Sequence, residues 1–214
     1  MRNAAALLIV ALIGLVPAAT AQTGTHDQAL QALKSADAGA RRSAAARLGD
    51  VGTMTDMPAL VSALRDTDGE TREAAEQAMW EIWSHSGNAE VDRLYRAGVE
   101  QMSGGDLSSA IATFSRIIAQ KPDFAEGWNK RATLYFLAGD FRKSLADCDE
   151  VMKRNPYHFG ALSGYVQIYI RLEYYERALD YSRRALDVNP NLDGVRQNMR
   201  ALEKLIDERK AKMI

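Results

Sequence analysis

The sequence predicts an all-α fold in which short helices stack as a repeat array, and three observations lead to this prediction. The 214 residues include only 5 prolines and 15 glycines, so few residues interrupt helices. Pro122, Pro156 and Pro190 recur at intervals of 34 residues, each after a helical stretch of about 14 residues. One helix pair cannot bury both of its faces, so units with such a period must stack on one another.

The composition excludes several classes of protein. Lys and Arg number 27 and Asp and Glu 28, and this net charge of −1 argues against a strongly basic nucleic-acid binder. Apolar residues make up 47% and charged residues 26%, as in an ordinary globular chain rather than a disordered one. The single cysteine, Cys148, excludes a disulfide framework and a cysteine-rich zinc site. The three histidines are scattered, so we expect no metal and no cofactor.

Residues 1–21 have the features of a secretory signal peptide. Arg2 supplies the positive charge, residues 4–16 form an apolar run, and Ala19, Thr20 and Ala21 are the small residues that a signal peptidase requires. This run of about 13 residues is shorter than the ~20 needed to span a bilayer. We therefore expect export, to the periplasm of a bacterium or as a secreted protein, with no membrane span after cleavage. An uncleaved N-terminal anchor is the alternative.

Residues 22–87 show a different period of about 31 residues. Leu33 matches Leu64 and Arg41 matches Arg72, and alanine-rich helical stretches alternate with polar turns. The pattern resembles short HEAT-like repeats, whose second helix begins with an arginine followed by a pair of small residues. The resemblance implies a second helical segment before the 34-residue repeats.

The junction between the two periods is a short polar break at residues 84–88. It is too short for a free linker, so we expect the two halves to touch. Trp80 and Trp83, one helical turn apart, are predicted to form that junction; the alternative is an exposed aromatic patch for a partner.

Residues 91–190 resemble three tetratricopeptide repeats, in phase at 91–124, 125–158 and 159–192. The middle copy carries Trp128, Ala132, Tyr135 and Pro156 at positions of the family pattern. Gly-Asp turns at 105–106 and 139–140 also match, because glycine permits a tight turn and aspartate caps the next helix. The resemblance implies a right-handed α-α superhelix. The chain departs from the pattern at Arg131, Cys148, Glu173, Tyr174 and Ser182.

Residues 191–214 are predicted to form a capping helix, which the last pair of a solenoid requires. Val195, Met199, Leu202 and Ile206 fall at i, i+4, i+7 and i+11, which places them in one apolar stripe. Basic residues occupy the other face, which we expect to be solvated; a site for an anionic partner is the alternative.

The family resemblance also implies a binding surface, because tetratricopeptide repeats bind extended peptides or partner helices on their concave face. The matching positions offer apolar anchors and amides that can bond to a peptide. They lack the positive charges of the family's carboxylate clamp, so a clamp of that kind is not expected. Some of these residues could instead pack between repeats. The candidate residues are Tyr95, Val99, Met102, Asn129, Thr133, Phe136, Ser163, Gln167 and Arg171.

The residues point to no catalytic chemistry. Cys148 falls in a packing column with acidic neighbours that disfavour a thiolate, and no acid–base pair stands out. We therefore expect an exported, non-enzymatic scaffold or adaptor that binds a protein or peptide partner and no nucleic acid. The alternatives are a structural subunit of a homo-oligomer or envelope complex and, less favoured, an enzyme without a recognisable motif.

Overall fold

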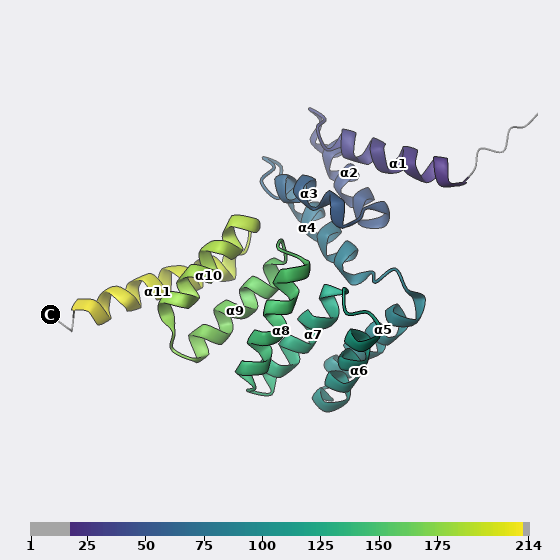
Figure 1. Ribbon diagram of the computed structural model, residues 1–214. Coiled ribbons are helices and arrows are strands. Elements are labelled where there is room, and N and C mark those ends of the chain that lie inside the picture. The colour runs from purple at the N-terminus through teal and green to yellow at the C-terminus, as the bar shows by residue number, and fades with distance from the viewer. Residues whose placement is uncertain (1–17, 212–214) are drawn as a thin grey trace, which may run out of the picture.

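A computed structural model describes residues 18–211, and within this range the chain is all-α, as predicted (Figure 1). The expected signal peptide lies outside the described residues except for 18–21, which begin the first helix. No helix in the described range is long and apolar enough to cross a membrane. The elements are α1 (Ala18–Ala32), α2 (Ala38–Val51), η1 (Met54–Asp56), α3 (Met57–Ala63), α4 (Gly69–Ser84), α5 (Ala89–Ser103), α6 (Leu107–Gln120), α7 (Ala125–Leu137), α8 (Phe141–Arg154), α9 (Phe159–Arg171), α10 (Tyr175–Val188) and α11 (Asp193–Ala211).

The 34-residue repeats form three helical hairpins, α5–α6, α7–α8 and α9–α10, which stack in chain order (Figure 1). The turns inside the first two hairpins have the predicted chemistry. Gly105 and Gly139 have φ angles of +79° and +78°, which only glycine adopts without strain. Asp106 and Asp140 follow them and accept hydrogen bonds from backbone N–H groups of the next helix, at 3.1 and 3.2 Å. These caps fix where α6 and α8 begin.

Small residues let the two helices of a hairpin approach each other. A Cβ atom at Gly98 would lie 2.8 Å from the Cζ atom of Phe114, closer than real side chains come. Ala132 occupies the equivalent position in the next hairpin, where Ser144 Oγ donates a hydrogen bond of 2.7 Å to its carbonyl oxygen. Close packing of this kind makes each hairpin a rigid unit.

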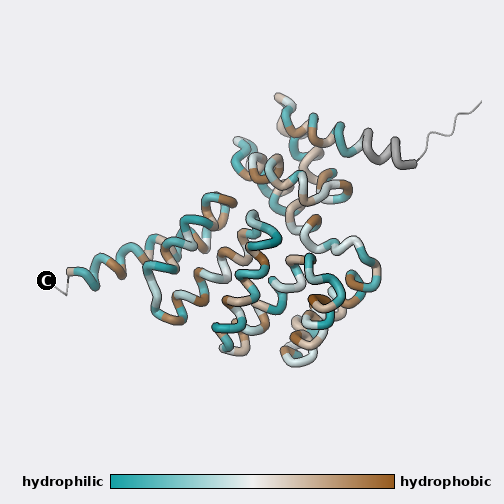
Figure 2. The backbone as a smooth tube through the Cα atoms, viewed as in Figure 1, coloured by the Kyte–Doolittle hydropathy of each residue, from teal (hydrophilic) through white to brown (hydrophobic). Residues whose placement is uncertain are grey.

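The helix α11 covers the end of the stack by packing on α10. Val195, Leu202 and Ile206 of the predicted stripe are buried and Met199 is half-buried. Figure 2 shows hydrophobic and hydrophilic residues alternating along this helix, as an amphipathic cap requires.

The N-terminal segment, α1 to α4, repeats its contacts with the predicted period. Arg41 Nη1 donates to the carbonyl oxygens of residues 35 and 36, and Arg72 Nη1 donates to those of residues 66 and 67, in each case 31 residues further on. Arg41 also forms two hydrogen bonds of 2.7 and 2.8 Å with the carboxylate of Asp66. These bonds lower the pKa of Asp66 to about 2 and join the turns of the two units.

The N-terminal segment does not continue the stack of hairpins at the end formed by α5. Instead, α4 lies across the loops that connect successive hairpins, above α7 to α9 in Figure 1. At its middle, Glu76 accepts a hydrogen bond of 3.0 Å from Asn189 in the loop before α11. Near its end, the Trp83 ring stacks on His158 in the loop before α9, with 4.4 Å between ring centroids. The two halves therefore touch, as predicted, but side by side rather than end to end.

The third hairpin has a strained turn. Glu173 has a φ angle of +60° at the position that glycine holds in the other two hairpins. A side chain in this left-handed conformation costs roughly 1 kcal/mol or more.

We expect Glu173→Gly to raise the free energy of unfolding by about 1 kcal/mol, measured by urea denaturation. Glu173→Ala is the control, because it also removes the exposed ion pair with Arg209 but keeps the Cβ atom. Equal stabilisation by both variants would contradict the strain.

Candidate functional site

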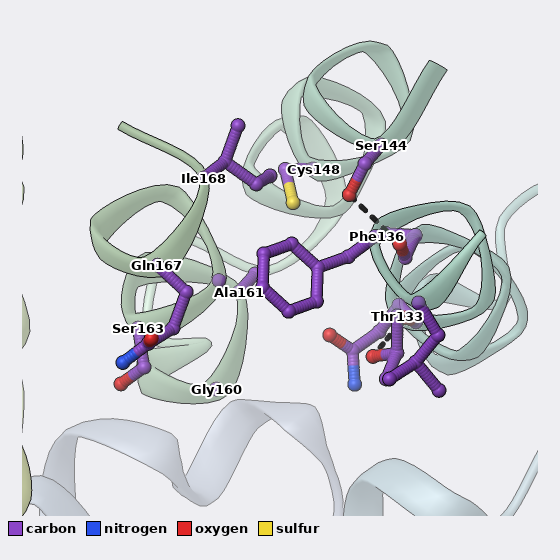
Figure 3. Close-up of a pocket in the computed structure, with 13 residues that line it drawn as sticks. Thr133, Phe136, Ser144, Cys148, Gly160, Ala161, Ser163, Gln167 and Ile168 are labelled. Atoms are coloured by element: carbon purple, nitrogen blue, oxygen red, sulfur yellow. Dashed lines mark hydrogen bonds between the residues drawn. The ribbon is translucent and has the colours of Figure 1, made fainter. Parts of the chain in front are cut away.

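A cavity of about 290 Å³ opens between α7 and α9 on the face formed by the first helices of the hairpins (Figure 3). Its walls are mostly apolar, and small residues on α9 leave the space free. The lining residues are Asn129, Ala132, Thr133, Phe136 and Leu137 of α7, Ser144 and Cys148 of α8, and Gly160, Ala161, Ser163, Gly164, Gln167 and Ile168 of α9. Five of the nine predicted concave-face residues are among them.

Phe136 forms the apolar centre of this cavity. Figure 3 shows its ring projecting from α7 into the space before α9. The ring is half-buried and lies 5.7 Å from the ring of Phe141, centroid to centroid, which holds it on one side. Its neighbour Leu137 is 55% exposed and extends the apolar wall toward solvent. An apolar group entering the cavity would therefore be enclosed by fixed aromatic and aliphatic surface.

The polar residues of the cavity differ in what they can offer. Thr133 Oγ1 donates to the carbonyl oxygen of Asn129 at 3.1 Å, and Ser163 Oγ donates to that of Phe159 at 2.8 Å. Both hydroxyl protons are thus used within their own helices. The Gln167 side chain is exposed and forms no hydrogen bond within the described range, so its amide can both donate to and accept from a ligand.

Tyr95 does not line the cavity between α7 and α9, contrary to our expectation that it belongs to the binding surface. Its ring packs between Phe114 and Phe124, with centroids 6.0 and 5.8 Å away, and its hydroxyl donates to Glu126 at 3.3 Å. Burial, with the charge of Glu126 beside it, raises the pKa of this hydroxyl far above its usual range. Tyr95 therefore joins the first repeat to the second and is not free for a partner.

Three other candidate residues also lie outside the cavity. Val99 and Met102 are half-buried and pack against the core of the α5–α6 hairpin, and neither lines the cavity. Arg171, at the end of α9, is exposed, and its guanidinium lies 5.9 Å from the Phe141 ring centroid. It lies outside the lining of the cavity.

Asn129 lines the cavity but is committed to a buried carboxylate. Its Nδ2 donates to Glu126 Oε2 at 3.1 Å, and Lys130 Nζ lies 3.0 Å from Glu126 Oε1. His158 Nε2 donates to the same carboxylate at 2.8 Å. Burial raises the pKa of Glu126, but the bonds from His158 and Lys130 outweigh it and hold the pKa below its usual range. Glu126 is therefore ionised and satisfied.

The tautomer of the His158 ring follows from its second hydrogen bond. Its Nδ1 accepts the backbone N–H of Ala161 at 3.1 Å and so caps the start of α9. A nitrogen that accepts carries no proton, so the hydrogen of the neutral ring is on Nε2 and points to Glu126.

We did not predict the Glu126–His158 pair, although the sequence contains a signal for it. Positions 124, 158 and 192 are equivalent in the repeats, and two of them are Phe124 and Leu192. A histidine in an otherwise apolar column would be buried and would need a partner.

The two tryptophans lie at the junction between the halves of the chain. Trp83 is only 4% exposed, so it cannot serve as a partner patch. Trp80 is half-buried, with its ring centroid 5.3 Å from that of Phe159. A Cβ atom at Gly160 would lie 2.7 Å from Trp80 Cη2. Trp80 therefore packs against Gly160, which is part of the cavity wall, but Trp80 itself does not line the cavity.

The charged and nucleophilic groups near the cavity are structural. Burial, with Asp147 and Asp149 nearby, raises the pKa of the Cys148 thiol to about 12, so it stays protonated. Arg131 takes the place of the family's leucine and forms hydrogen bonds of 2.7 and 2.8 Å with Asp147. Among the described residues, no group of three or more potential ligands could hold a metal ion.

Sequence comparisons agree with this architecture. Residues 161–192 match the family model of the tetratricopeptide repeat. A TPR repeat-containing protein of Rhizobium etli is 37% identical over 108 residues, which cover 50% of this chain and 53% of that protein. Tetratricopeptide repeat protein 12 of Mus musculus is 27% identical over 101 residues, which cover 47% of this chain and 14% of that protein. The chain thus spans about half the length of the first relative and far less of the second.

Solved structures show the same fold. The first TPR domain of Spaghetti (RPAP3), bound to an HSP90 peptide, superimposes with a TM-score of 0.53 and 20% identity, over 55% of this chain and 93% of that one. The Sgt2 TPR domain from Aspergillus fumigatus gives a TM-score of 0.55 and 19% identity, over 58% and 83%. The fold and the cavity define an α-helical solenoid with a groove on the face of its first helices. The family match at residues 161–192 adds that the third hairpin of this solenoid has the sequence of a tetratricopeptide repeat.

The packing role of Tyr95 can be tested by its removal. We expect Tyr95→Ala to lower the free energy of unfolding by roughly 3 kcal/mol, because it leaves a hole between two phenylalanines. Tyr95→Phe keeps the ring and loses only the bond to Glu126, so it should cost about 1 kcal/mol. Urea denaturation of both variants measures the difference. If Tyr95→Ala were as stable as the parent protein, the residue would belong to the surface.

Proposed function

We propose that this protein is an exported adaptor that binds a protein or peptide partner in the cavity between α7 and α9. The observation that supports this most is the cavity itself, which has apolar walls around Phe136 and one free amide, that of Gln167. Such a combination suits an extended peptide or a helix that inserts one large apolar side chain.

The charges around the cavity favour a particular kind of ligand. Lys130 is engaged by Glu126, and among the described residues no cationic side chain lines the cavity. A terminal carboxylate would therefore find no counter-charge there. The ligand that fits best is an internal peptide segment with an apolar anchor, whose backbone bonds to Gln167.

The location and the N-terminal segment are part of the proposal. The charged, apolar and small-residue sections of residues 1–21 support export. The 31-residue spacing of the Arg41 and Arg72 contacts supports a HEAT-like origin of α1 to α4. In this proposal the segment serves as a brace, because Trp80 packs against Gly160 of the cavity wall and α4 holds the loops before α9 and α11.

The cavity can be filled without damage to the fold. A Cβ atom at Gly164 would lie 3.5 Å from Cys148 Sγ, an ordinary contact, and leucine is a better helix former than glycine. We expect Gly164→Leu to weaken partner binding at least tenfold without a loss of thermal stability. Affinity would be measured by fluorescence anisotropy, with peptides selected on the full chain from a displayed random library.

Gly194→Leu is the matched control, because Gly194 lies in α11 and a Cβ atom there meets nothing within 4 Å. It should leave binding unchanged. Binding that survived Gly164→Leu undiminished would overturn the groove proposal.

A further inference from the structure

A second cleft lies on the seam between the N-terminal segment and the repeats. It has a volume of about 180 Å³, far more than one water molecule needs. Its walls come from η1, the end of α4, the loop before α7 and the end of α8. The lining residues are Met54, Ile82, Trp83, His85, Ser86, Lys121, Asp123, Phe124, Ala125, Arg154 and Asn155.

One polar group in this cleft lacks a hydrogen-bond partner among residues 18–211. Asn155 is 0% exposed, and its Oδ1 accepts the backbone N–H of Tyr157 at 3.1 Å, which fixes the orientation of the amide. Its Nδ2 forms no hydrogen bond within the described part of the chain. A buried donor without an acceptor costs about 1–3 kcal/mol, so an acceptor that reached it would gain this energy.

The equivalent residue of the next repeat shows which kind of acceptor the amide at this position binds. Asn189 is the equivalent residue 34 positions later, and its Oδ1 likewise accepts a backbone N–H, that of Asn191, at 2.9 Å. There, however, Nδ2 donates to Glu76 of α4 at 3.0 Å. The N-terminal segment thus supplies an oxygen acceptor to one of two equivalent amides, that of Asn189. Within the described residues it supplies none to the amide of Asn155.

The charges of the cleft favour a neutral acceptor. Lys121 Nζ lies 3.2 Å from Asp123 Oδ2, and Arg154 Nη1 donates to Glu150 Oε2 at 2.6 Å. Both cations are therefore paired, and a carboxylate would find no unpaired charge. A peptide carbonyl needs only a donor, which Asn155 provides.

The rest of the cleft suits an apolar side chain. Ile82 and Phe124 form the wall, and Met54 stands at the mouth with 42% of its surface exposed. A neighbouring hollow of about 420 Å³ shares Met54, Ile82, His85 and Ser86 with the cleft. Two adjoining hollows give room for several residues of extended chain, at about 3.3–3.6 Å per residue.

We propose that this seam cleft is a second peptide-binding site. It takes a neutral, extended segment of a partner, with a main-chain carbonyl oxygen accepting from Asn155 Nδ2 and an apolar side chain against Ile82 and Phe124. The site is separate from the α7–α9 cavity, so the proposal for one site can fail while the proposal for the other holds.

The test uses the full chain and peptides selected from a random 12-residue library displayed on phage. Synthetic versions of the selected peptides are then measured on variants. Asn155→Asp keeps the acceptor for Tyr157 but replaces the free donor with an anion, and Met54→Glu blocks the mouth from an exposed position. We expect one class of peptides to bind both variants at least tenfold more weakly while binding Gly164→Leu normally. Met54→Glu keeps the test decisive if Asn155→Asp does not fold.

The control is Gln197→Glu, the same amide-to-acid change at an exposed residue of α11. The proposal is overturned if every selected peptide binds Asn155→Asp and Met54→Glu as tightly as the parent. A crystal structure with an ordered water as the only partner of Asn155 Nδ2, in the presence of such a peptide, would also overturn it. A class of selected peptides that binds only with a free C-terminal carboxylate, and no longer binds when the C-terminus is amidated, would contradict the proposal of a neutral acceptor.

Discussion

One buried carboxylate, that of Glu126, joins α5, α7 and the loop before α9. It accepts hydrogen bonds from Tyr95 of α5, Asn129 of α7 and His158 in the loop before α9. His158 in turn stacks on Trp83 of the N-terminal segment. A buried group that loses its hydrogen-bond partner costs about 1–3 kcal/mol, and more when it is charged, so these contacts fix the elements against one another.

This arrangement determines the form of the binding surface. A solenoid unit contacts only its neighbours, so a tetratricopeptide array can flex along its length. Here α4 lies across the loops before α9 and α11 and holds them through Trp83 and Glu76. The cavity between α7 and α9 is thereby preformed, and a ligand loses less binding energy to ordering its receptor.

Much of the architecture could be predicted because the repeat period constrains it. The 34-residue columns identified the hairpins, their Gly-Asp turns and the apolar stripe of α11. The same columns placed Asn129, Thr133, Phe136, Ser163 and Gln167 on one surface, where they line the cavity.

The remaining features depend on contacts that a period does not encode. Tyr95 is drawn into packing by Phe114, Phe124 and Glu126, partners outside its own column. Periodicity specifies which hairpins stack, but not what covers their loops, so the position of α4 could not be predicted. The cleft at Asn155 depends on that position and was missed for the same reason.

The most direct test of the groove is to ask which face touches the partner. A photo-crosslinking amino acid would be placed at Gln167, which is exposed and lines the cavity, and separately at Ala146, which is exposed on α8 outside it. Each protein would be irradiated with the partner peptide or an envelope extract. We predict a crosslinked product from position 167, lost when Gly164→Leu is added, and none from position 146. Crosslinking at 146 alone, or equally at both positions, would contradict the groove as the binding surface.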